Sequence, residues 1–115
     1  MQKPLQITFR GLDHSDAIEQ RIRDKAVELE RFSAHLTGCH VTVHAPPGHH
    51  HKGGTYAVNV DLQVPSGQLV VSREPGRDHA HEDVYVALRD AFNAAVRQLE
   101  DYVRRQRGEV KRHVG

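Results

Sequence analysis

The longest regular hydrophobic pattern in this chain lies in residues 82–107. Apolar side chains recur there at alternating steps of three and four residues, at Tyr85, Leu88, Phe92, Ala95, Leu99 and Tyr102. This spacing places them on one face of a 3.6-residue helical turn, and that face must be buried. We therefore predict a long amphipathic helix from Glu82 to Arg107, with both tyrosines on its core side. Gly108 is expected to terminate it.

The preceding residues predict one shorter helix and four strands. Apolar and polar residues alternate at 5–10, 39–44 and 56–64, as they do in half-buried strands, and a fourth strand is expected at 68–73. A helix from Ser15 or Asp16, either of which could be its N-cap, to about His35 is expected between the first two strands. Residues 65–67 supply the turn of a hairpin. The predicted fold is α+β, in the order β-α-β-β-β-α, with a four-stranded mixed sheet, both helices packed on one face and the other face polar.

Length and composition indicate one cytoplasmic domain. With 115 residues, the chain fits a single domain over 1–107, followed by a basic C-terminal tail at 108–115. Its only cysteine, Cys39, cannot form an internal disulfide and is expected to be a small buried residue. No run approaches the ~20 apolar residues of a membrane span, and the first ten residues do not resemble a signal peptide.

Arginines gather on the long helix and beyond it. On a helical wheel, four of them fall within roughly 80° of one another: Arg89, Arg97, Arg104 and Arg107. We expect this row of arginines to lie beside the apolar stripe. Residues 97–113 hold six basic side chains, Lys111 among them, although the net charge of the whole chain is only +1. A stripe of fixed cations is what a surface following a phosphate backbone requires.

The openings of the two predicted helices carry a family resemblance. Helix one opens with Ser15, Asp16, Ala17 and Ile18, followed by Ile22 and Lys25, and helix two opens with Asp-Val-Tyr-x-Ala-Leu-Arg-Asp-Ala at 83–91. With the element order, these motifs resemble the ribosome hibernation-promoting factors, also called ribosome-associated inhibitor A, over roughly residues 4–107. The likeness is to the short class, without the dimerisation extension of the long forms.

The resemblance implies a cytoplasmic stress-response protein that binds the small ribosomal subunit and its rRNA in the messenger and transfer RNA channel. Translation would be blocked by occlusion, without an enzyme activity, cofactor or small-molecule substrate, and we expect a monomer in solution. The family's basic helix surfaces would correspond to Arg21, Arg23, Lys25 and Arg31 on helix one and to Arg89, Arg97, Arg104, Arg105 and Arg107 on helix two. The chain departs from the family pattern where Asp90, Glu100 and Asp101 interrupt the cations and where the loop at 46–54 is lengthened.

A metal-binding protein is the alternative that the histidines leave open. Ten histidines are present, with His49, His50 and His51 consecutive in a glycine-rich loop. His40 and His44 lie on one side of the second strand, where Asp61 of the neighbouring strand could join them. Neutral imidazole is a good ligand for zinc and nickel, but a third and fourth ligand have no definite place.

Two further function classes can be weighed from the sequence. No phosphate-binding glycine loop, nucleophile elbow or HExxH motif is present, so the residues give no support to catalysis. Pairing with another protein through an exposed strand edge is a third possibility.

Overall fold

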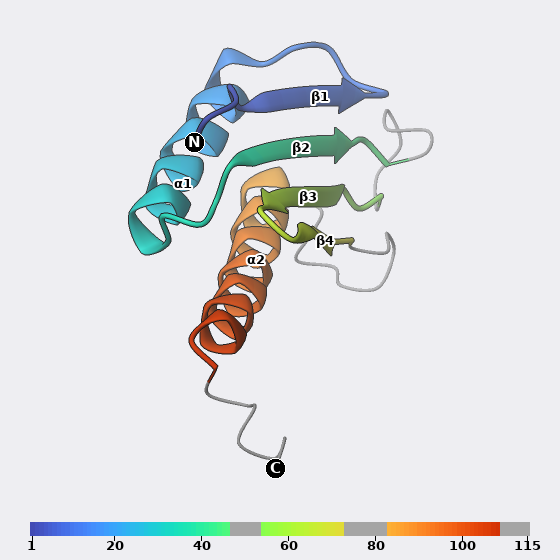
Figure 1. Cartoon of the computed structure of the whole chain (residues 1–115). Coiled ribbons are helices and arrows are strands. Elements are labelled where there is room, and N and C mark those ends of the chain that lie inside the picture. The colour runs from blue at the N-terminus through green and yellow to red at the C-terminus, as the bar shows by residue number, and fades with distance from the viewer. Residues whose placement is uncertain (47–53, 73–82, 109–115) are drawn as a thin grey trace.

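The computed structural model describes residues 1–46, 54–72 and 83–108 of this chain (Figure 1). Its elements follow the predicted order: β1 (Gln6–Arg10), α1 (Asp16–Phe32), β2 (Gly38–His44), β3 (Ala57–Val64), β4 (Gly67–Val71) and α2 (Val84–Gln106). The predicted α+β class is therefore confirmed. None of the helices in these ranges is long and apolar enough to cross a membrane.

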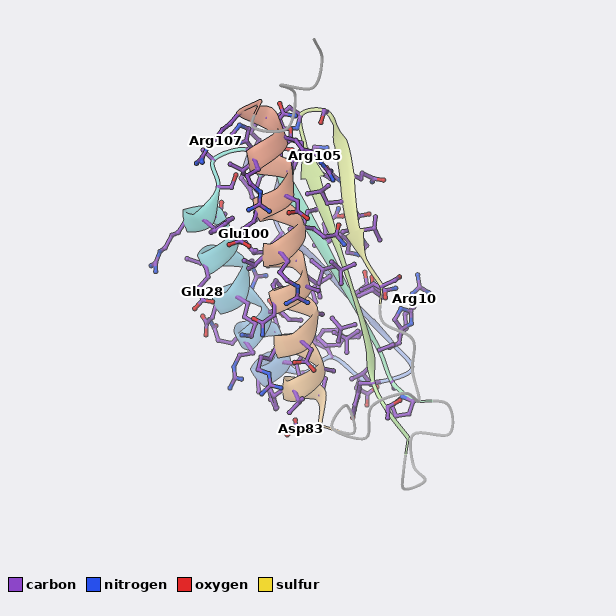
Figure 2. The ribbon with its side chains drawn as sticks, turned by 90° about the horizontal axis from the view of Figure 1, so that it is seen from below. Arg10, Glu28, Asp83, Glu100, Arg105 and Arg107 are labelled. Atoms are coloured by element: carbon purple, nitrogen blue, oxygen red, sulfur yellow. The ribbon has the colours of Figure 1, made fainter. Side chains whose placement is uncertain are left out.

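The four strands form one mixed sheet in the order β1-β2-β3-β4. β1 and β2 are parallel because α1 carries the chain back to the start of the sheet between them, whereas β2, β3 and β4 form an antiparallel meander. Figures 1 and 2 show both helices on the same face of this sheet. The molecule is thus a two-layer structure with one face of the sheet uncovered by helices.

The core lies between the sheet and the helices. Alternate residues of β2 and β3 are buried on this side, among them Val41, Val43, Val58 and Val60, all 0% exposed. The helices contribute Ile22, Leu29, Leu88 and Leu99, each at most 1% exposed. The residues between the buried ones in β2 and β3 are polar and half-buried, which confirms the predicted polar face: His40, Thr42, His44, Asn59, Asp61 and Gln63.

The two ends of α1 are set by serine hydroxyl groups. Ser15 is the N-cap, and its Oγ accepts the backbone N–H of Ile18 at 3.2 Å. The helix ends at Phe32 and not near His35 as predicted. Ser33 takes an extended conformation (φ −149°), and its Oγ accepts the backbone N–H of His35 at 3.0 Å. A serine hydroxyl that bonds locally in this way competes with continuation of the helix.

α2 begins two residues later than predicted, because Asp83 is its N-cap and Oδ1 of Asp83 accepts the backbone N–H of Tyr85 at 2.9 Å. Glu82 and the predicted strand end at Arg73 lie outside the described residues. Gly108 follows the helix with a φ of +79°, as expected of a glycine that terminates a helix.

Candidate nucleic-acid interface

α1 and α2 lie side by side and run in the same direction (Figure 1). Near their N-terminal ends, the guanidinium carbon of Arg21 lies 4.7 Å from the centroid of the Tyr85 ring. Just beyond the C-terminal end of α1, the rings of His35 and Tyr102 pack edge to face with centroids 5.8 Å apart. The outward sides of these two parallel helices form one continuous area, which we call the two-helix surface.

The arginines of α2 lie on its outer face. Arg89, Arg97, Arg104 and Arg107 are all exposed and follow the helix over about 27 Å at 1.5 Å per residue. On the helical wheel, Arg97 and Arg104 lie opposite the core, whereas Arg89 and Arg107 lie beside the edge of the apolar stripe, as predicted. The stripe is wider than the strict three-and-four pattern indicated, because Val96 and Val103 are partly buried and also pack against the core. All four arginines are exposed, with 59% of the Arg89 side chain and 54% of the Arg104 side chain accessible to solvent.

Arg105 does not join this row of arginines. Arg105 is exposed, but it precedes Arg107 by two residues, which places its side chain about 200° around the helix from that of Arg107. Figure 2 shows Arg105 on the β4 side of α2 and Arg107 on the α1 side. Lys111 lies outside the described residues.

The basic residues of α1 are distributed around the helix and do not form a row. Arg21 contacts α2 through Tyr85, and Lys25, one turn further along, lies on the same side of α1. Arg23 lies on the other side of the helix, about 200° from Arg21, and Arg31 lies on its outer face. Of the four cations that the family resemblance pointed to on α1, only Arg21 and Lys25 lie toward α2.

Carboxylates accompany several of these cations. Salt bridges join Arg23 to Glu19 at 2.7 Å, Arg89 to Asp90 at 3.1 Å and Arg104 to Asp101 at 2.5 Å. Arg97 forms no salt bridge with a carboxylate of the described residues. Figure 2 also shows Glu100 on the side of α2 that faces α1. The two-helix surface is therefore cationic with acidic interruptions.

A family model matches almost the whole of this arrangement. The model of the sigma 54 modulation protein / S30EA ribosomal protein family covers residues 5–107, from the start of β1 to the end of α2. The chain belongs to this family. The resemblance to hibernation-promoting factors that the helix openings indicated is thereby confirmed.

Solved structures share the fold of this family member. The N-terminal domain of Protein Y from Thermus thermophilus matches with a TM-score of 0.62 and 20% identity, over 84% of this chain and 94% of that chain. A ribosomal subunit interface protein from Coxiella burnetii matches with a TM-score of 0.57 and 19% identity, over 85% of this chain and 94% of that one. Similarity at this level of identity supports the fold.

The metal-binding alternative finds no support in this family member. Nε2 of His40 is hydrogen-bonded to Oγ1 of Thr8 at 2.8 Å, and Nε2 of His44 accepts the amide N–H of Asn59 at 3.3 Å. His40 is paired with Asp61 across β2 and β3, as the alternation predicted, but the two histidines are in no group of potential metal ligands among the described residues. His49, His50 and His51 lie outside the part of the chain that the structure describes.

A different cluster of potential ligands was not predicted. His14, Asp16 and Glu19 at the start of α1 bring their ligand atoms within 4.8 Å of one another. Nε2 of His14 contacts Asp16 at 2.8 Å and Glu19 at 3.2 Å, while Arg23 also bonds Glu19. Hydrogen bonds and ion pairs among these surface side chains explain why they lie close together, without a metal ion. The helical spacing of Asp16, Glu19 and Arg23 could have indicated it, although the position of His14 depends on the loop.

Cys39 is buried, as predicted, and 3% exposed. Burial, together with the nearby charges of Asp61 and Glu30, raises the pKa of its thiol from 9.0 to about 12. The thiol is therefore protonated at physiological pH and a poor nucleophile in the folded protein.

Proposed function

We propose that this protein silences ribosomes by binding the small subunit through its two-helix surface, with arginine side chains on rRNA phosphates. Bound in the channel used by messenger and transfer RNA, it would exclude both and stop translation under stress. No bond is made or broken in this mechanism, which requires neither a catalytic residue nor a cofactor. The protein would act in the cytoplasm and as a monomer.

The observation that carries the proposal is the row of exposed arginines on the outer face of α2, on a chain that belongs to a ribosome-associated family. The planar guanidinium group can bond two phosphate oxygens at once, so arginine suits this contact better than lysine does. Because the four side chains are exposed, they can reach a ligand without any change in the packing of α2.

The carboxylates on this surface do not prevent such binding. Exposed ion pairs contribute about 0–1 kcal/mol, so a phosphate group can replace Asp90 or Asp101 as the partner of its arginine at little cost. Phosphate contacts release counterions, so each contact makes log affinity fall with log salt by about 0.7–0.9. The proposed complex should therefore dissociate as salt is raised.

The test is a charge reversal on the outer face of α2. Arg97→Glu with Arg104→Glu should abolish co-sedimentation with small ribosomal subunits at moderate salt, while circular dichroism and thermal unfolding show an intact fold. Lys3→Glu with Arg10→Glu is the matched control, because it changes the net charge equally; Figure 2 shows Arg10 on the sheet, away from both helices. Loss of binding by both variants, or by neither, would reject the two-helix surface as the contact.

A further inference from the structure

Arg21 and Tyr85 form a stacked pair that joins the two helices. The guanidinium carbon of Arg21 lies over the Tyr85 ring at 4.7 Å from its centroid, a cation–π contact. Tyr85 is half-buried and packs against the core, whereas Arg21 is exposed. The ring therefore supports the guanidinium group from its inner side and leaves its outer side towards solvent.

The backbone around Tyr85 is fixed by the start of α2. The carboxylate of Asp83 accepts the backbone N–H of Tyr85 at 2.9 Å, which anchors the first helical turn beneath the ring. On α1, Arg21 lies one turn after Ala17 and within a regular helix whose buried face includes Ile18 and Ile22. Both members of the pair are thus held by regular helices and not by a loop.

Two further cations lie one turn from the pair. Lys25 follows Arg21 by four residues on α1, and Arg89 follows Tyr85 by four residues on α2, so each lies on the same side of its helix as its neighbour in the pair. Neither Arg21 nor Lys25 forms a salt bridge with any carboxylate in residues 1–46, 54–72 or 83–108. The stacked pair consequently lies beside two further cations, of which Arg89 also bonds Asp90.

We infer that the Arg21–Tyr85 pair is a stacking site for an unpaired RNA nucleobase, with Lys25 and Arg89 on the phosphates that flank it. This inference rests on the proposed function, because it assigns a base contact within the same two-helix surface. A planar guanidinium group stacks on nucleobases, and only a base that is free of a duplex can offer its face. Contacts to phosphates alone do not distinguish one RNA from another, whereas the stacking site would favour single-stranded RNA.

Arg21→Lys is the most direct test, since it keeps the charge and removes the plane. Its affinity for a single-stranded adenosine oligonucleotide should fall about five- to tenfold, the lower part of the range for one stacked base. Its affinity for an RNA duplex of equal length should change less than twofold. Arg10→Lys, the same substitution on the sheet and away from both helices, should change neither affinity more than twofold.

The ring is tested separately. Tyr85→Phe keeps an aromatic support and should bind single-stranded RNA nearly as the wild type does, whereas Tyr85→Leu should reproduce the loss seen with Arg21→Lys. An unchanged affinity of Arg21→Lys for the single strand, or an equal loss on the duplex, overturns the stacking site.

The two proposals fail in different ways. If Arg97→Glu with Arg104→Glu releases the protein from small subunits while Arg21→Lys behaves as wild type on both RNAs, the proposed function stands and the stacking site is refuted. If the wild-type protein binds neither RNA nor small subunits, both are refuted.

Discussion

Asp101→Asn should strengthen binding to the small subunit, because it removes a carboxylate from beside Arg104, which we propose binds an rRNA phosphate. Asp101 bonds Arg104 at 2.5 Å, and both side chains are 54% exposed. A phosphate held by Arg104 would lie roughly 6 Å from that carboxylate, where two unit charges in water repel by about 0.7 kcal/mol. Breaking the exposed Arg104–Asp101 pair costs a further ~0.2–1 kcal/mol, and salt screening reduces the repulsion. Together these contributions predict a gain of about four- to fifteenfold in affinity at low salt, and less as salt is raised.

The assay is a titration of isolated small subunits at several potassium concentrations, with unfolding followed in parallel. Since the pair is exposed, its loss should change the free energy of unfolding by less than about 1 kcal/mol. Asp61→Asn is the matched control: it makes the same change of charge on the polar face of the sheet, which the helices do not cover. Unchanged binding by Asp101→Asn, or an equal gain from Asp61→Asn, would refute the local pairing argument.

Two further predictions concern the fold. Leu99→Ala should lower the free energy of unfolding by about 2–5 kcal/mol in urea titrations, because Leu99 is fully buried. Val70→Ala, at a position that is 51% exposed, should lower it far less. Comparable losses in the two variants would contradict the assignment of Leu99 to the core. Cys39, whose thiol pKa is raised from 9.0 to about 12, should resist alkylation at pH 8 until urea unfolds the protein. As pH rises, the thiol of the unfolded chain ionises before that of the folded protein. The stability that the raised pKa of Cys39 contributes is therefore complete below pH 9 and is lost as pH rises toward 12. The free energy of unfolding of Cys39→Ala should accordingly decline less steeply over that range than that of the wild type.

The element order could be predicted because each element carries its own period. Val41 and Val43 alternate with polar residues as a strand requires, and Leu88, Phe92 and Leu99 repeat as a helix requires. The polar face of the sheet followed from the same alternation. Helix ends were less predictable, because the end of α1 depends on one hydrogen bond from the backbone N–H of His35 to Ser33 Oγ.

The site was predicted only in part. The wheel grouped Arg97 with Arg104, and both are exposed, but the partial burial of Val96 and Val103, which widens the apolar stripe, comes from packing that no local pattern specifies. Contacts between the helices, such as Arg21 with Tyr85, depend on how α1 and α2 are placed on the sheet, which no local pattern specifies. The pairing of Arg104 with Asp101 could have been read from their helical spacing, since three residues separate neighbours on one face.

The central claim is that the helices, and not the open face of the sheet, lie against ribosomal RNA. Hydroxyl-radical cleavage from a tethered iron chelate tests it most directly, because the buried thiol of Cys39 leaves an introduced cysteine as the reactive one. With the chelate on Asn93→Cys, between Arg89 and Arg97 on the outer face of α2, we expect cuts in the rRNA of the small subunit. With the chelate on Gln68→Cys, an exposed position of β4 on the polar face, we expect far weaker cuts. Strong cleavage from Gln68→Cys and none from Asn93→Cys would contradict the account.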